Sequence, residues 1–273
     1  MLKPDVITEL QDMRKLAWSR IRRSSGTAGS FLKSEIRGRR KTYFKLSCYD
    51  SVNGITGHES INEIIVCRLL DALGIEHLDY QLIHALVEIE GKEYETWICA
   101  SEDYKEYGES KVALDDYYEM WRNGGETPLE FCVRMGWDEY IYQMLVVDFL
   151  ILNRDRHGAN IEILKNKMTG VVRPAPLFDH GVSLLYNCRT EDDLQQFDPM
   201  EDKPVQSYIG SKSARENLEL IPKGRMPKVN MLTDSDREAL FKDLDEALPK
   251  TYQEKIWEMI QARCEYYESM QNR

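Results

Sequence analysis

Apolar side chains recur at two different spacings along this chain, and the change of spacing predicts where strands give way to helices. Residues 41–47 alternate between polar and apolar positions, which predicts a strand. Residues 80–90 and 93–100 alternate in the same way on either side of a Gly-Lys pair, which predicts a hairpin. Between the strand and the hairpin, residues 59–74 have apolar side chains at helical spacing and end on a glycine, which predicts an amphipathic helix.

Helical spacing dominates the rest of the chain. We predict helices at residues 114–121, 128–135 and 138–152, and two more within residues 235–271 that are separated at Pro249. Residues 4–20 are expected to be a short helix packed against the amino-terminal sheet. Residues 187–230 are polar and contain prolines, which predicts a segment on the surface.

Two apolar runs in the middle of the chain lead into unusual polar sequences. The first run, at residues 146–152, leads into Asn-Arg-Asp-Arg-His-Gly-Ala-Asn at residues 153–160, and the second leads into Leu-Phe-Asp-His-Gly at residues 177–181. A buried element ordinarily ends in turn residues or caps rather than in three charged groups and a histidine. An ordinary polar loop is the alternative, and we interpret the two segments together as an active site.

The order of oxygen-bearing side chains in these segments is typical of phosphoryl transfer from Mg-ATP. In that reaction the protein positions the acceptor, holds Mg²⁺ with oxygen ligands and offsets the charge of the phosphoryl group. We predict that Asp155 accepts the proton of the attacking hydroxyl, and that Asn160 and Asp179 coordinate the metal ions.

The arrangement Asp-Arg-His-x-x-Asn followed by Asp-x-Gly resembles that of the HipA-like and related small bacterial Ser/Thr protein kinases, and more distantly that of the phosphatidylinositol 3- and 4-kinases. The likeness extends from about residue 24 to about residue 183. It implies an α+β, bilobal protein-kinase-like fold, with a small mixed β lobe at residues 1–102 and a larger, mainly helical lobe at residues 103–273. It also implies ATP and Mg²⁺ as cofactors.

Three further side chains of the first segment have two interpretations each. By resemblance to the lipid kinases, His157 is a candidate to donate a hydrogen bond to the transferred phosphate, and the alternative is that it braces the loop. Arg154 and Arg156 would either contact phosphate groups or pair with nearby acids. A metal site formed by His157, His180 and Cys188 is another alternative, although Mg²⁺ chemistry explains the neighbouring acids better.

Residues 24–30 form the stretch that is densest in glycine and small hydroxyl side chains, and a kinase needs such a turn over the phosphates. The residues predicted to approach the phosphates are Gly26, Thr27, Ala28, Gly29 and Ser30. The stretch departs from both the Gly-x-Gly-x-x-Gly pattern and the Walker loop, and a surface linker would have a similar composition. Some HipA-like kinases autophosphorylate in this loop, so by resemblance its hydroxyls are candidate phosphorylation sites.

The remaining parts of a kinase site are assigned by their order along the chain and by resemblance. Lys45 is the predicted phosphate-binding lysine, with Lys33 as its rival. Glu63 of the following helix is expected to pair with Lys45, and Glu59, one turn earlier, is the competing candidate. The backbone around Ser101, where the lobes should join, is expected to meet the adenine edge.

Composition and charge narrow the function further. The net charge of −11 argues against nonspecific nucleic-acid binding, which depends on Lys and Arg side chains that neutralise phosphates. No apolar run is long enough to cross a bilayer and no signal peptide is recognised, so we expect a cytoplasmic protein that binds neither membranes nor nucleic acid directly. The six cysteines include no Cys-x-x-Cys pair, which indicates neither a zinc site nor a disulfide framework.

Three classes of function remain open on this basis. The first is an ATP-dependent Ser/Thr protein kinase with an unknown protein substrate, for which a translation-related substrate and an antitoxin partner follow from the resemblance alone. The second is a kinase for a lipid or small molecule, which the likeness of the motif to lipid kinases favours. The third is a nonenzymatic binding module on a kinase scaffold. The joint presence of Lys45, Asp155, Asn160 and Asp179 argues against this last class.

Overall fold

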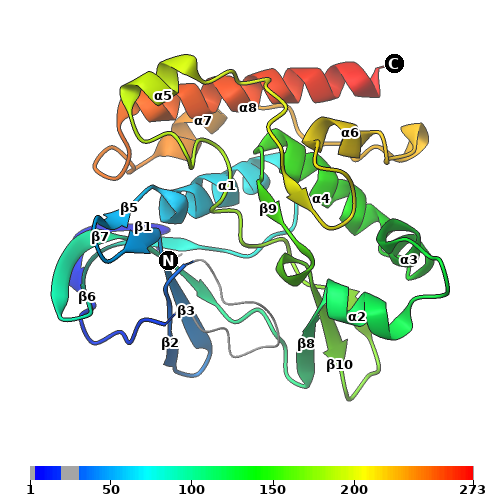
Figure 1. Ribbon diagram of the computed structural model, residues 1–273, viewed down its shortest axis with the longest axis horizontal. Coiled ribbons are helices and arrows are strands. Elements are labelled where there is room, and N and C mark those ends of the chain that lie inside the picture. The colour runs from blue at the N-terminus through cyan, green and yellow to red at the C-terminus, as the bar shows by residue number, and fades with distance from the viewer. Residues whose placement is uncertain (1–3, 20–30, 273) are drawn as a thin grey trace.

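The computed structural model describes residues 4–19 and 31–272, and Figure 1 shows a sheet-bearing part beside a larger helical part. The amino-terminal part is built on a five-stranded sheet with the strand order β1-β6-β7-β3-β2. The bounds of these strands are β1 Val6–Asp12, β2 Lys33–Arg37, β3 Lys41–Leu46, β6 Gln81–Ile89 and β7 Lys92–Glu102. The predicted strand is β3 and the predicted hairpin is formed by β6 and β7, so both expectations are confirmed.

The first strand occupies a segment where the sequence predicted a helix, and that prediction is wrong. β1 pairs in parallel with β6, and the Leu82 amide donates a hydrogen bond of 2.7 Å to the Asp5 carbonyl. Without β1, β6 would present a row of unpaired backbone groups at the edge of the sheet. The β-branched side chains of Val6, Ile7 and Thr8 also favour an extended backbone.

The carboxy-terminal part is mainly helical, as its spacing predicted. Its helices are α2 Leu114–Trp121, α3 Pro128–Arg134, α4 Asp138–Leu150, α5 Glu191–Gln196, α6 Ala214–Leu218, α7 Asp234–Phe241 and α8 Lys250–Gln271. The predicted helices correspond to α2, α3, α4, α7 and α8, and the last two lie on either side of Pro249. The short helices α5 and α6 lie within residues 187–230, where only a polar surface segment was predicted.

Two small sheets in this part have no counterpart in the sequence prediction. The first has the strand order β11-β10-β8, with bounds β8 Glu109–Ala113, β10 Glu162–Asn166 and β11 Val172–Pro174. In the second, β9 (Asp155–Arg156) pairs in parallel with β12 (Gln206–Ser207). This pairing ties the long polar segment to the first polar motif. Such short strands depend on partners that are distant in the sequence, so local alternation scarcely indicates them.

Helix α1 (Glu59–Leu73) is the helix predicted for this segment, and it ends where Gly74 adopts a φ of 72°. Figure 1 shows α1 between the large sheet and the helices α7 and α8. Because both of its sides are covered, polar side chains of its first two turns are buried too, and the helix is less amphipathic than expected. Ile64, Ile65 and Leu69 are fully buried, and each contributes roughly 1.5–3 kcal/mol relative to an exposed position.

Two hydrophobic clusters cover opposite faces of the large sheet. Leu82 and Ile83 are neighbours on β6, so their side chains point to different faces. Leu82 belongs to a cluster that continues through α1 into α4 and α8, whereas Ile83 packs in a smaller cluster with Phe44 and Leu46. The larger cluster therefore joins α1 to the helical part. The small hairpin β4 (Cys48–Asp50) and β5 (Gly54–Thr56) follows β3.

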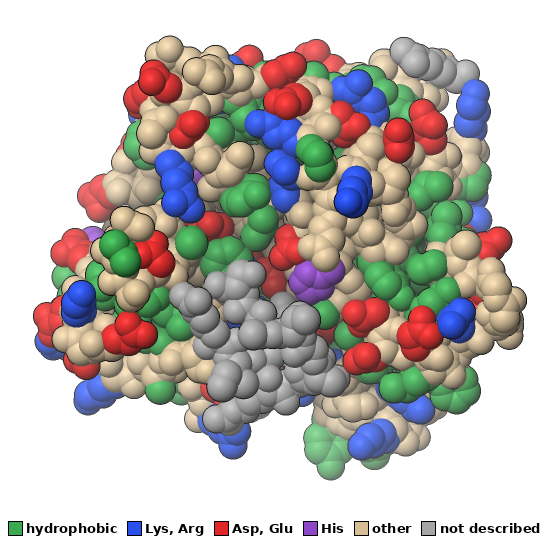
Figure 2. Space-filling model, in the orientation of Figure 1, with side chains coloured by type: hydrophobic (Ala, Val, Ile, Leu, Met, Phe, Trp, Pro, Cys, Tyr) green, Lys and Arg blue, Asp and Glu red, His purple; other side chains and the backbone are tan. Residues whose placement is uncertain are grey.

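These features confirm an α+β, bilobal fold. β7, the last strand of the large sheet in the chain, ends at Glu102, and β8 pairs with β10 in the carboxy-terminal part. The domain boundary between residues 102 and 103 stays a prediction. Among the described residues, no helix has both the length and the apolar character needed to cross a membrane. On the face drawn in Figure 2, acidic and basic side chains of the described residues are intermingled.

Candidate active site

A cleft of about 570 Å³ lies between the large sheet and the carboxy-terminal part. Lys33, Lys45 and Ser101 line it from the sheet, and Ala159 and Asp179 line it from the two polar motifs. The volume is within the range of pockets that hold small molecules and cofactors. The cleft thus brings together residues that the sequence assigned to one site from widely separated positions.

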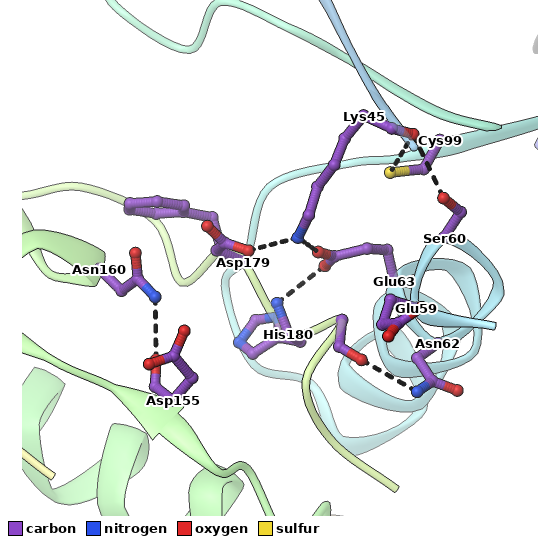
Figure 3. Close-up of polar contacts among 12 residues, drawn as sticks. Lys45, Glu59, Ser60, Asn62, Glu63, Cys99, Asp155, Asn160, Asp179 and His180 are labelled. Atoms are coloured by element: carbon purple, nitrogen blue, oxygen red, sulfur yellow. Dashed lines mark hydrogen bonds and ion pairs between the residues drawn. The ribbon is translucent and has the colours of Figure 1, made fainter. Parts of the chain in front are cut away.

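Lys45 occupies the centre of the polar contacts in this cleft (Figure 3). Its Nζ lies 2.8 Å from Glu63 Oε1 and 2.5 Å from Asp179 Oδ1. Strand alternation causes this orientation, because Phe44 and Leu46 face the smaller hydrophobic cluster and Lys45 faces α1. Burial alone would lower the pKa of Lys45, but the Asp179 and Glu63 carboxylates outweigh it and raise the pKa. The lysine is therefore a fixed positive charge.

Glu63 connects three segments of the chain. While Oε1 accepts from Lys45, Oε2 accepts a hydrogen bond of 2.8 Å from the His180 amide. The rival Glu59 lies one turn earlier and accepts a hydrogen bond of 3.2 Å from the Cys48 amide instead. Burial raises the pKa of Glu59. Of the two acids, Glu63 is the one that contacts Lys45.

The second lysine candidate lies beside the first. Lys33 on β2 is the register partner of Lys45 on β3, and its Nζ lies 3.7 Å from Asp179 Oδ2. The Lys33 side chain is 36% exposed, whereas that of Lys45 is 10% exposed. Two cations from neighbouring strands therefore lie near the Asp179 carboxylate. Both Lys33 and Lys45 are placed to contact an anionic ligand.

Asp155 and Asn160 are not among the residues that line the cleft, and both are held by hydrogen bonds within the first motif. The Asn160 Nδ2 donates a hydrogen bond of 2.9 Å to the Asp155 carbonyl, which places the amide oxygen at the far side from Asp155 (Figure 3). The Asp155 amide donates to Asn153 Oδ1 at 3.2 Å. His157 Nε2 lies 3.8 Å from Asp155 Oδ1, and both side chains are partly exposed.

Arg156 is buried, and it joins the two motifs. Its guanidinium donates to both carboxylate oxygens of Asp148 at 2.9–3.2 Å. Its Nη1 donates to the carbonyl of Asn160 at 3.2 Å and to that of Phe178 at 3.0 Å. Arg156 therefore pairs with an acid, whereas Arg154 donates to the Pro204 carbonyl at 2.6 Å. The sequence contains a signal for this pairing. Asp148 lies within an apolar run, and a buried carboxylate needs a cation as its partner.

Two side chains near Asp179 were not assigned a role from the sequence. The Asp179 amide donates to the Tyr80 hydroxyl at 3.2 Å. The Asn62 amide group donates to the carbonyls of Gly181 and Ser183 at 3.0 and 2.9 Å. Asp179 has a φ of 59°, a backbone conformation that costs free energy for a residue with a side chain. The contacts around it hold this conformation in place.

Other predicted site residues lie apart from these contacts or outside the described residues. Ser101 on β7 is the register partner of Tyr43 and lines the cleft. The candidates of the glycine-rich stretch, Gly26, Thr27, Ala28, Gly29 and Ser30, lie outside the described residues. His180 is buried, which lowers its pKa well below the usual value, and within the described part of the chain it forms no ligand cluster with His157 and Cys188.

The donor set at the two motifs fits a hard divalent cation. Asp179 offers carboxylate oxygens and Asn160 an amide oxygen, which are ligand types that Mg²⁺ accepts. Arg156 binds the carbonyl of Asn160 and that of the residue before Asp179, so one buried side chain sets the positions of both candidate ligands. A cation between them would also lie beside the lysines that contact Asp179.

No protein-family model matches the sequence, and no curated protein matches it. The structure is similar to that of the Helicobacter pylori proinflammatory kinase CtkA, with a TM-score of 0.61, 14% sequence identity and 96% of each chain covered. It is also similar to a chain of the Shewanella oneidensis MR-1 complex of HipA, HipB and operator DNA, with a TM-score of 0.52 and 13% identity over 91% of this chain and 67% of that chain. Because the sequence identities are only 14% and 13%, the likeness shows a shared fold and nothing beyond it. The protein therefore shares the fold of these two structures, a kinase-like fold as the resemblance of its motifs predicted.

Proposed function

We propose that this protein is an ATP-dependent Ser/Thr protein kinase that transfers the γ-phosphate of Mg-ATP to a protein hydroxyl. The observation that carries the proposal is the contact of Lys45 with both Glu63 and Asp179 inside the cleft. A buried lysine held between two carboxylates is an arrangement that protein kinases use to bind phosphates next to a metal ligand.

The proposed roles follow from the contacts of these side chains and from their order in the chain. Lys45, held by Glu63, would bind the phosphates, and Lys33 would add a second positive charge beside them. Asp179 and Asn160 would hold Mg²⁺, which when bound neutralises charge on the phosphates. Asp155 would accept the proton of the acceptor hydroxyl, for which its partly exposed side chain is accessible.

Further roles rest on the order of the chain and on the resemblance to the HipA-like kinases. The backbone around Ser101 would meet the adenine, and residues Gly26 to Ser30 would cover the phosphates. Autophosphorylation at the hydroxyls of residues 24–30, a translation-related substrate and an antitoxin-like partner are extensions of the same proposal. Phosphopeptide mapping after incubation with Mg-ATP tests the first of these, and a loop without phosphate would remove it.

The experiment compares acceptors directly. The purified protein is incubated with ATP labelled at the γ-phosphate, together with a protein mixture in one arm and phosphatidylinositol vesicles in the other. We expect label in protein and not in lipid, label reduced about 10²-fold or more with Asp155→Ala, and no label with Asp179→Ala. Label in lipid alone would replace the proposal by the lipid-kinase alternative, and equal labelling by the variants would remove the assigned roles.

A further inference from the structure

A second cluster of ligand-bearing side chains lies on α1 and the segment that follows it, beside the proposed nucleotide site. Cys67 lies on α1, and His77 and Asp79 lie on the segment between α1 and β6. The candidate ligand atoms of these three residues all lie within 4.8 Å of one another, and no other such group of three is found among the described residues. The sequence did not indicate it, because the residues are not arranged as a Cys-x-x-Cys pair.

The orientation of His77 is the first observation that points to a metal. Its Nδ1 lies 2.8 Å from the Ile75 carbonyl, so this nitrogen carries the proton and donates. The lone pair of Nε2 is then directed at Cys67 Sγ, which lies 3.2 Å away. Histidines that bind metals are commonly fixed in this way, with one ring nitrogen donating to a carbonyl and the other directed at the ion.

The charges around the cluster are the second observation. Asp71 Oδ1 lies 3.9 Å from His77 Nε2, so a further carboxylate lies near the cluster, although Asp71 is not one of the three residues whose ligand atoms all lie within 4.8 Å of one another. A cation at this point would offset the negative charge of these carboxylates.

The exposure of these side chains allows a metal ion to reach the cluster from solvent. Cys67 is buried and the His77 side chain is 5% exposed, whereas the Asp71 side chain is 70% exposed and Asp79 lies at the surface. An ion could thus enter past the carboxylates and reach the sulfur and nitrogen ligands behind them.

We propose that Cys67, His77 and Asp79 bind a divalent transition-metal ion, with Zn²⁺ as the best chemical match and a water molecule as the fourth ligand. One sulfur, one nitrogen and one or two oxygen ligands suit the tetrahedral preference of Zn²⁺, whereas Mg²⁺ prefers oxygen ligands alone. On binding, a metal–sulfur bond replaces the S–H bond of Cys67 and the proton leaves to solvent. No oxidation or reduction is involved.

The position of the cluster gives the ion a structural role behind the active site. Cys67 lies one turn after Glu63 on α1. His77 forms a parallel bridge with Leu177, and the Leu78 amide donates to the Leu177 carbonyl at 2.8 Å, two residues before Asp179. Tyr80, whose hydroxyl accepts from the Asp179 amide, follows on the same segment. An ion bound to Cys67 and His77 would therefore connect the helix of Glu63 to the segment that supports Asp179.

The test measures metal binding without nucleotide, so its outcome is independent of kinase activity. Chelator-treated protein is titrated with Co²⁺, whose thiolate complexes absorb in the near ultraviolet, and with Zn²⁺ in competition with a chromophoric chelator. We expect one ion per chain with a thiolate band. Cys67→Ser should abolish the band, and His77→Gln and Asp79→Asn should each weaken Zn²⁺ binding about tenfold or more. Cys264→Ser, on α8, is the matched control and should bind as the unchanged protein does.

Asp79→Asn keeps the test valid if substitution of the buried Cys67 prevents folding, because Asp79 lies at the surface. Zn²⁺ should also raise the melting temperature of the unchanged protein, and by less in Asp79→Asn. Absence of stoichiometric binding at micromolar Zn²⁺ would overturn the proposal, and so would binding that is as tight in the His77→Gln/Asp79→Asn double variant as in the unchanged protein.

Discussion

Lys45 Nζ lies 2.5 Å from Asp179 Oδ1, although 134 positions separate the two residues in the chain. Glu63 fixes the lysine from one side, and its other oxygen holds the amide of His180, the residue that follows Asp179. The contact therefore depends on β3, α1 and the second polar motif at once. In the proposed kinase, nucleotide and metal would enter between a lysine and a carboxylate that already face each other.

The first prediction separates the roles of the two acids. Asp155→Ala should lower kcat about 10²–10⁴-fold, because the acceptor hydroxyl loses its proton acceptor. The affinity of the Asp155→Ala variant for Mg-ATP should be unchanged. Asp179→Ala should abolish turnover and also weaken Mg-ATP binding, since a metal ligand is removed. Calorimetric titration with Mg-ATP, alongside turnover measurements, distinguishes these outcomes, and equal nucleotide affinity in both variants would contradict the assignment.

The second prediction concerns the buried pair. Lys45→Met should destabilise the fold by about 3–5 kcal/mol, because Glu63, whose side chain is 0% exposed, would keep a buried charge without its cation. The double variant Lys45→Met/Glu63→Met should recover most of that stability but remain inactive. Lys33→Met is the matched control, and since Lys33 is more exposed we expect a much smaller loss of stability. Urea unfolding of these four proteins and of Glu63→Met provides the measurement, and additive losses in the double variant would argue against the pairing.

The third prediction tests Arg156 as a positioning residue. Arg156→Lys keeps the charge but cannot reach Asp148, Asn160 and Phe178 together, because lysine lacks the planar fork of donors. We expect a loss of about 2 kcal/mol in stability. The kcat should fall about 10²-fold, because both candidate metal ligands shift.

The control for this prediction is Arg154→Lys, whose parent side chain makes a hydrogen bond to a single carbonyl. It should change kcat and stability little. If the two variants lose the same activity, Arg156 does not position the motifs.

The fourth prediction is a dependence of stability on pH. Burial lowers the pKa of His58 from 6.5 to about 4, so the folded protein keeps this imidazole neutral while the unfolded chain takes up a proton. Stability from this group is therefore full above pH 6.5 and is lost as the pH falls towards 4. Between pH 7.5 and pH 5 the loss should be about 2 kcal/mol.

His58→Gln cannot take up this proton, so its free energy of unfolding should fall less steeply over the same interval. Chemical unfolding of both proteins at the two pH values gives the comparison. Parallel curves for the two proteins would show that His58 is not the responsible group.

Local patterns in the sequence were sufficient for much of the fold and for the residues of the two motifs. Helices α2, α4 and α8 begin at the residues that the spacing indicated or close to them, because an amphipathic period is a property of neighbouring positions. The Asp-Arg-His-x-x-Asn and Asp-x-Gly motifs were recognisable for the same reason. Their chemistry is encoded in residue types at short, fixed separations.

Contacts between distant segments decided the rest. Glu59 and Glu63 are one turn apart on the same helix, and only the packing of α1 against β3 directs Glu63 to Lys45. The strand β1 forms because β6 needs a partner. The cluster of Cys67 and His77 exists because the chain reverses after α1. Such pairings depend on burial and on the geometry of long-range packing, which residue spacing along one segment does not encode.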